Sequence, residues 1–239
     1  MTHNRLGTLS AALFGGGWTI AVAVNLFFWL PESFGVDPAF YEDSQRFLQF
    51  VHENAITWRI FHIGATSGLA GLILLVPALG ALRRGDSRQP MMVAAGIIGA
   101  AVGLLASLID HLGTPVLARY AAGSNQTAHL IWEFVEPWRD AGLKTVSFWL
   151  LGVWVIWTAG LWLGGSLGEG PGRNNRRLGR FSQIMGVALL LLALIETLLP
   201  LPWRNTWGET GVMGLALLLL PVWGWWVARW FWQRELVAF

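Results

Sequence analysis

Six long apolar runs, separated by polar segments, constrain what this chain can fold into more than any other feature of the sequence. Each run is long enough to cross about 30 Å of hydrocarbon as an α-helix, which rises about 1.5 Å per residue. Backbone amides cannot stay unpaired in lipid, and continuous apolar runs lack the alternation of a membrane barrel. The sequence therefore predicts an all-α polytopic membrane bundle, forming a single integral membrane domain over residues 1–239. The six predicted transmembrane spans are residues 9–30, 58–82, 90–112, 145–167, 181–199 and 210–232.

The composition agrees with a membrane class and excludes several functions. The chain is 54% hydrophobic and 13% charged, whereas a soluble domain carries about a quarter charged residues. It contains no cysteine, which excludes disulfides, thiolate metal sites, cysteine nucleophiles and CxxCH haem attachment. The arginines lie in short segments between apolar runs, where membrane topology explains them. We therefore expect the lipid bilayer as a partner, and no nucleic acid.

The charges between the runs predict the orientation of the chain. The segments 83–88 and 173–180 are rich in arginine, and a six-span count puts them on the same side. Most of the acidic residues lie in the segments of the opposite side. Because basic segments remain on the cytoplasmic side, both termini are expected in the cytoplasm, in the cell (inner, cytoplasmic) membrane.

The longest interruption between apolar runs, residues 110–144, is predicted to form an extracytoplasmic lid of loop and helix. A helix is expected from Asn125 to Glu136, because Ser124 or Asn125 can cap it and Pro137 can end it. This segment also contains the densest set of proton- or metal-binding side chains in the chain, namely Asp110, His111, His129, Glu133, Glu136 and Asp140.

His129 and Glu133 are one helical turn apart, so a helix places them on one face. A histidine and a carboxylate in this arrangement can share a divalent metal ion or transfer a proton. The candidate metal ligands are His111, His129 and Glu133, with His52 or His62 as alternatives to His111. An ordinary exposed helix explains the same spacing.

Ionisable residues inside apolar spans are costly and mark candidate functional sites. His62 lies near the start of the second span, Asp110 and His111 end the third, and Glu196 ends the fifth. All of them fall in the outer half of the predicted bundle, which favours a shared polar pocket there. The alternative is that each side chain reaches the interface and stays hydrated. Together with the pair of His129 and Glu133 described above, Asp110 and Glu196 are the candidate catalytic residues.

His62 and His111 are also candidate cofactor ligands. One or two imidazoles that face an apolar cavity can ligate a haem or a (bacterio)chlorophyll, and both residues are expected at similar depth on neighbouring helices. The sequence leaves the cofactor itself undetermined.

Small residues recur at four-residue spacing in two of the spans. They are Gly64 and Gly68 in the second span, and Gly99 and Gly103 in the third. Such positions let helix backbones approach closely in lipid. Tight packing of the second span against the third is the expected result.

The C-terminal half resembles a bacterial family of multi-pass membrane proteins known only as a domain of unknown function. The resemblance is carried by SFWLLGVWVIWTAGLWL, by RRLGRFSQIMGVALLLLAL with its Leu178-Gly179 step after a basic turn, and by LLLLPVWGWWVARW. It implies a membrane fold of six to seven helices. It implies no activity and no functional residues.

No motif fixes a reaction, so the sequence leaves open whether the protein is an enzyme. The leading interpretation is an accessory or scaffolding subunit of a membrane assembly, with other membrane subunits as partners. One alternative is a membrane enzyme or transporter with a polar, metal-binding or proton-transferring site near its outer face. A second alternative is a haem- or (bacterio)chlorophyll-binding membrane subunit.

Overall fold

The computed structural model describes residues 3–32, 43–83, 85–123, 125–164, 173–198 and 213–237, and this part of the chain is helical throughout apart from short turns. The long helices are α1 (His3–Val24), α4 (Ala55–Gly80), α5 (Gln89–Leu112), α8 (Thr145–Leu163), α9 (Arg173–Leu198) and α11 (Met213–Val237). The shorter helices are α3 (Ser44–Glu53), α6 (Thr114–Ala122) and α7 (Gln126–Pro137). Two π-helical segments, η1 (Asn25–Trp29) and η4 (Trp138–Lys144), and two 3-10 turns, η2 (Leu30–Glu32) and η3 (Ala81–Arg83), continue them.

Five helical rods in the described residues are long and apolar enough to cross a membrane. They are Asn4–Trp29, Ala55–Arg83, Gln89–Ala122, Gln126–Leu163 and Asn174–Leu198. The prediction of a multi-pass all-α protein is thus supported. The sixth predicted span coincides with α11, a helix of 25 residues that is not among these five. The count of six spans and the location of the termini stay predictions.

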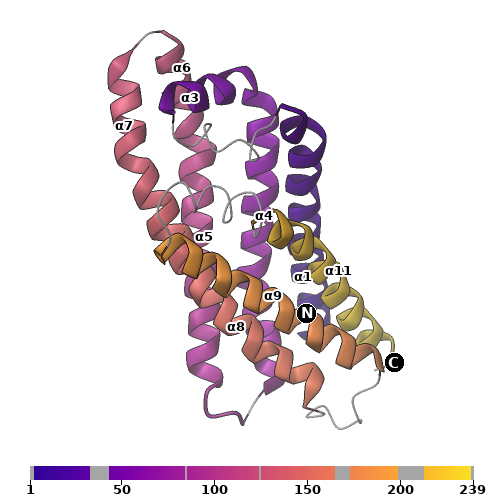
Figure 1. Cartoon of the computed structure of the whole chain (residues 1–239). Helices are drawn as coiled ribbons and strands as arrows, with labels where there is room; N and C mark the ends of the chain where they lie inside the picture. Colours follow the sequence, from indigo (N-terminus) through magenta and orange to yellow (C-terminus); the bar gives the residue numbers. More distant parts are fainter. Residues whose placement is uncertain are drawn as a thin grey trace.

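The six long helices form a closed ring, in the order α11, α1, α4, α5, α8, α9 and back to α11 (Figure 1). Aromatic side chains fill its interior: the ring of Trp223 lies 5.5 Å from Phe14 and 6.2 Å from Trp154. All three are almost completely buried. The centre of the bundle is therefore a packed apolar core.

Glycines set the close contacts between helices, but with other neighbours than expected. A Cβ on Gly68 would meet the ring of Trp18 in α1 at 2.9 Å, and one on Gly99 would meet the side chain of Leu150 in α8 at 2.9 Å. The second and third spans, α4 and α5, do pack against each other as predicted, but Gly64 and Gly68 face α1 and Gly99 faces α8. A stripe of small residues indicates a close approach, but it carries no information on which helix approaches.

A second apolar core lies at one end of the bundle. The helices α3, α6 and α7, which we call the cap, gather there around the end of α1 and the start of α4 (Figure 1). The buried side chains of this core are Val24, Trp29, Phe47, Leu48, Phe50, Val51, Trp58, Ala118 and Trp132. Trp29 and Trp58 stack on each other at 5.2 Å inside the cap.

The segment 110–144 is not a loop but a helical hairpin. Its first leg continues α5 through Gly113 into α6, and its second leg runs through α7 and η4 directly into α8. Asn125 caps α7, as predicted, by accepting a hydrogen bond from the Thr127 amide at 2.9 Å. The α-helix ends at Pro137, as predicted, but the backbone stays helical beyond it. Proline lacks an amide hydrogen, and the chain continues as the π-helix η4 rather than stopping.

The basic segment 173–180 is also helical, since it forms the first two turns of α9. The register of α9 against α8 is antiparallel: a Cβ on Gly186 would meet the Gly152 carbonyl at 2.9 Å, and one on Gly179 would meet the Ala159 carbonyl at 3.2 Å. This register brings the end of α9 toward η4, which it contacts.

Candidate functional site

A buried ion pair joins α5 to η4 between the bundle and the cap. Asp110 and Arg139 are each only 4% exposed, and the Arg139 guanidinium contacts the Asp110 carboxylate. The Thr114 hydroxyl donates a hydrogen bond to the same carboxylate at 3.1 Å, and Arg139 also lies 3.6 Å from Glu136. The indole of Trp58 donates to the backbone carbonyl of Asp110 at 3.0 Å, which ties the pair to the cap core.

His62 lies one turn beyond Trp58 on α4 and is 5% exposed. Its ring packs at 4.8 Å from Trp58 and at 5.1 Å from Phe61. Within the described part of the chain, neither ring nitrogen of His62 has a hydrogen-bond partner. The ionisable neighbours that act electrostatically on His62 are Asp110, Arg139, Lys144 and His111.

Glu196 reaches the same region from α9. It is 7% exposed and lies in the last turn of that helix. The antiparallel register of α8 and α9 puts it level with Gly142 in η4, and α9 contacts η4. We call the assembled set the polar cluster: His62, Asp110, His111, Glu136, Arg139, Lys144 and Glu196.

The other two sequence candidates lie in the cap. The Ser44 hydroxyl at the start of α3 donates to the Glu133 carboxylate at 3.0 Å and lies 3.4 Å from Nδ1 of His129. His129 and Glu133 therefore face a common neighbour, and this contact fastens α7 to α3. In the described ranges, no three histidine, aspartate or glutamate side chains form a group able to hold a metal ion. The structure thus does not bring His111, His129 and Glu133 together as a ligand set.

The four candidate catalytic residues therefore divide into two places. Asp110 and Glu196 belong to the polar cluster, whereas His129 and Glu133 belong to the cap contact. The two candidate cofactor ligands, His62 and His111, both lie in the polar cluster. Sequence reasoning missed Arg139, the main partner of Asp110. The available signal was its position three residues after Glu136, which puts both side chains on one helical face.

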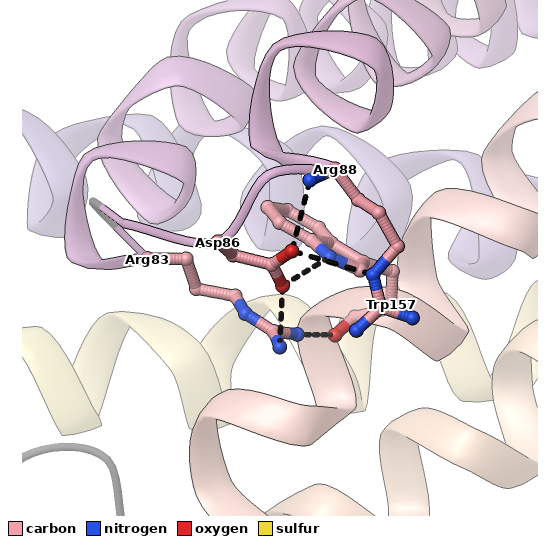
Figure 2. A network of polar contacts seen from close by, with 4 residues as sticks. All are labelled: Arg83, Asp86, Arg88 and Trp157. Atoms are coloured by element: carbon pink, nitrogen blue, oxygen red, sulfur yellow. Dashed lines mark hydrogen bonds and ion pairs between the residues drawn. The ribbon is translucent and has the colours of Figure 1, made fainter.

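A second charged network lies at the opposite end of α5, in the turn before it (Figure 2). The Asp86 carboxylate accepts hydrogen bonds from the Arg88 amide at 2.9 Å and from the Trp157 indole at 3.1 Å, and it pairs with Arg83 at 2.8 Å. Arg83 lies over the Trp157 ring at 4.6 Å and donates to the Trp157 carbonyl. These contacts hold the pKa of Asp86 below its ordinary value, and the hydrogen bond from the Arg88 amide has the largest effect. The network fastens the α4–α5 turn to α8.

No family model, no curated protein and no solved structure matches this chain. The resemblance of the C-terminal half to a bacterial multi-pass family therefore stays a prediction.

Proposed function

We propose that this multi-pass membrane protein binds and releases a proton at the polar cluster, as part of proton-coupled transport or of a membrane enzyme's reaction. The observation that carries the proposal is the buried His62 ring, whose two nitrogens have no hydrogen-bond partner among the described residues. Burying such a group without a partner costs free energy. A site that exchanges a proton explains why it is retained.

The charge balance of the polar cluster supports the same function. Among the described side chains it contains three carboxyl groups, on Asp110, Glu136 and Glu196, against two basic groups, on Arg139 and Lys144. With both histidines neutral and all carboxyls ionised, the cluster has one excess negative charge. Charges removed from water need compensation, and a proton on a histidine or on a carboxyl group supplies it.

The backbone of η4 also supports a proton-binding function. Single π-helical segments inside α-helices are rare and frequently occur at functional sites. Here the segment carries both basic members of the cluster, Arg139 at its start and Lys144 at its end. A change in the winding of η4 would move both positive charges relative to Asp110, which links protonation to movement of the cap hairpin.

Proton movement can be measured in proteoliposomes that contain a pH-sensitive dye. A membrane potential is imposed across the proteoliposome bilayer. Candidate solutes are then added one class at a time, namely monovalent cations, organic anions and weak bases. We expect a solute-dependent proton flux that is lost in His62→Gln and Asp110→Asn and kept in His52→Gln, since His52 is exposed. Equal fluxes in all four proteins would contradict the proposed role of the polar cluster.

The unpartnered nitrogens of His62 are equally compatible with ligation of a tetrapyrrole, with His111 as the second candidate ligand. A visible absorption spectrum of protein purified from its native membranes separates the two functions. A Soret or chlorophyll band that disappears in His62→Gln would favour the tetrapyrrole.

A role as an accessory or scaffolding subunit is favoured by a different observation. Leu130 and Phe134 on α7 and Trp138 at the start of η4 recur every four residues and are exposed, so they form one apolar face on the cap hairpin. By contrast, the glycine stripes at Gly64 and Gly99 are occupied by helices of this same chain. If α7 packs against another membrane subunit, Phe134→Asn should reduce the size of the complex on a native gel. Tyr120→Ser, at another exposed aromatic position, on α6, should leave the size of the complex unchanged.

A further inference from the structure

An exposed apolar stripe on α9 continues directly into arginines. Its large apolar residues recur at intervals of three and four, which places them on one side of the helix. These residues are Ile184, Val187, Leu191, Leu194 and Leu198. Arg180 and Arg177 extend the same series by one and two turns toward the start of α9, and both are exposed. The change from apolar to charged residues on a single face marks the depth at which hydrocarbon gives way to headgroups.

The neighbouring helix α11 has the same pattern. Its exposed face carries Leu218, Val222 and Trp225, and then Arg229 and Trp232. The tryptophans on either side of Arg229 are of the type that prefers the headgroup layer.

The two arginine-bearing ends lie side by side. The Trp223 indole of α11 donates to the Ser182 hydroxyl of α9 at 2.9 Å, and the Trp230 indole donates to the Asn175 amide oxygen at 3.2 Å. The helices are therefore antiparallel, and this register puts Arg229 level with Arg177.

The described residues provide little negative charge to neutralise these arginines. Arg177, Arg180 and Arg229 form no ion pair with any carboxylate among the described residues. Where side chains are described, Asp86 is the carboxylate at this end of the bundle, and Arg83, Arg88 and Trp157 already occupy it (Figure 2). Two further acidic residues, Glu169 in the sequence between α8 and α9 and Glu235 near the end of α11, lie outside the described side chains.

We infer that Arg177, Arg180 and Arg229 form a binding surface for the phosphate groups of anionic phospholipids in the leaflet at this end. The planar guanidinium presents two parallel donors to a phosphate and binds it more specifically than an ammonium does. The apolar stripes of α9 and α11 receive the acyl chains of the same lipid molecule. This inference is independent of the polar cluster, which lies at the opposite end of the bundle.

Thermal melting of the full chain in detergent, monitored by circular dichroism, tests the inference. The melting temperature is compared with and without added phosphatidylglycerol or phosphatidylcholine. A ligand that binds only the folded state raises the melting temperature. We expect phosphatidylglycerol to raise it in the wild type and in the control variant Arg59→Gln/Arg119→Gln, whose exposed arginines lie at the cap end. The rise should vanish in Arg177→Gln/Arg180→Gln/Arg229→Gln and be reduced in the matching triple lysine variant.

Three results would overturn the inference. They are an equal rise with phosphatidylcholine, an equal rise with inorganic phosphate alone, and an undiminished rise in the triple glutamine variant. If the triple variant does not fold, the single variants Arg180→Gln and Arg229→Gln decide the matter. Each must then reduce the rise caused by phosphatidylglycerol, and two unchanged rises would overturn the inference in the same way.

Discussion

At the scale of single residues, the Asp110–Arg139 pair is the least replaceable contact of the polar cluster. Removing one member of a buried ion pair leaves the other charge uncompensated, at a cost of about 3–5 kcal/mol. Arg139→Met should therefore lower the free energy of unfolding by about that amount, measured as loss of helicity on titration with SDS. The double variant Asp110→Leu/Arg139→Met should recover most of the loss, because neither charge then remains buried. A double variant as unstable as the single one would show that the pair is not the source of the effect.

Asp86 predicts a pH effect at the opposite end. The pKa of its carboxyl is lowered from 3.8, mainly by the Arg88 amide and also by the Trp157 indole. A group with a lowered pKa in the folded state contributes stability above its unfolded value, and this stability is lost as the pH falls through the folded value. The wild type should therefore melt at a lower temperature when the pH is below 3.8 than it does at neutral pH. Asp86→Asn should melt lower at neutral pH and lose less on acidification, whereas Glu53→Gln at the cap end should follow the wild type.

At the scale of helices, backbone contact between α1 and α4 is the most restrictive feature. A Cβ on Gly17 would fall on the Gly64 carbonyl and 2.5 Å from the Gly68 amide nitrogen, and neither is a movable side chain. Overpacking of this kind typically costs about 1–3 kcal/mol. Gly17→Ala should thus be clearly less stable than the wild type in the same SDS titration. Gly16→Ala is the matched control, since its Cβ would lie 3.8 Å from the Trp225 ring. Equal stabilities of the two variants would contradict the described α1–α4 interface.

The helices themselves could be predicted from the sequence because each is set by its own length and apolarity. What could not be predicted depends on which elements meet. The stripe at Gly64 identifies a close approach, but only the tertiary fold puts α1 there. The burial of Trp29 and Trp58 depends on the cap, whose core is assembled from segments far apart in the chain. A common depth for Asp110, His62 and Glu196 could be expected from their places in the spans, whereas Arg139 became part of the cluster only because the chain stays helical through Pro137.

At the scale of the whole molecule, the cap and the arginine-rich end should lie on opposite sides of the membrane. The chain contains no cysteine, so single cysteines report their side without background. Thr127 in the cap and Ser87 in the α4–α5 turn are both exposed. In intact cells, a membrane-impermeant maleimide should label Thr127→Cys, and it should label Ser87→Cys only after permeabilisation. The reverse pattern would contradict the predicted cytoplasmic termini.

The most direct measurement of the proton-binding claim is the titration of His62 by nuclear magnetic resonance of histidine-labelled protein in micelles. The variant His62→Gln identifies the resonance. We expect the ring of His62 to change its protonation state while the protein stays folded, and Asp110→Asn to move this transition. A His62 resonance that keeps one protonation state over the whole folded range would contradict the account.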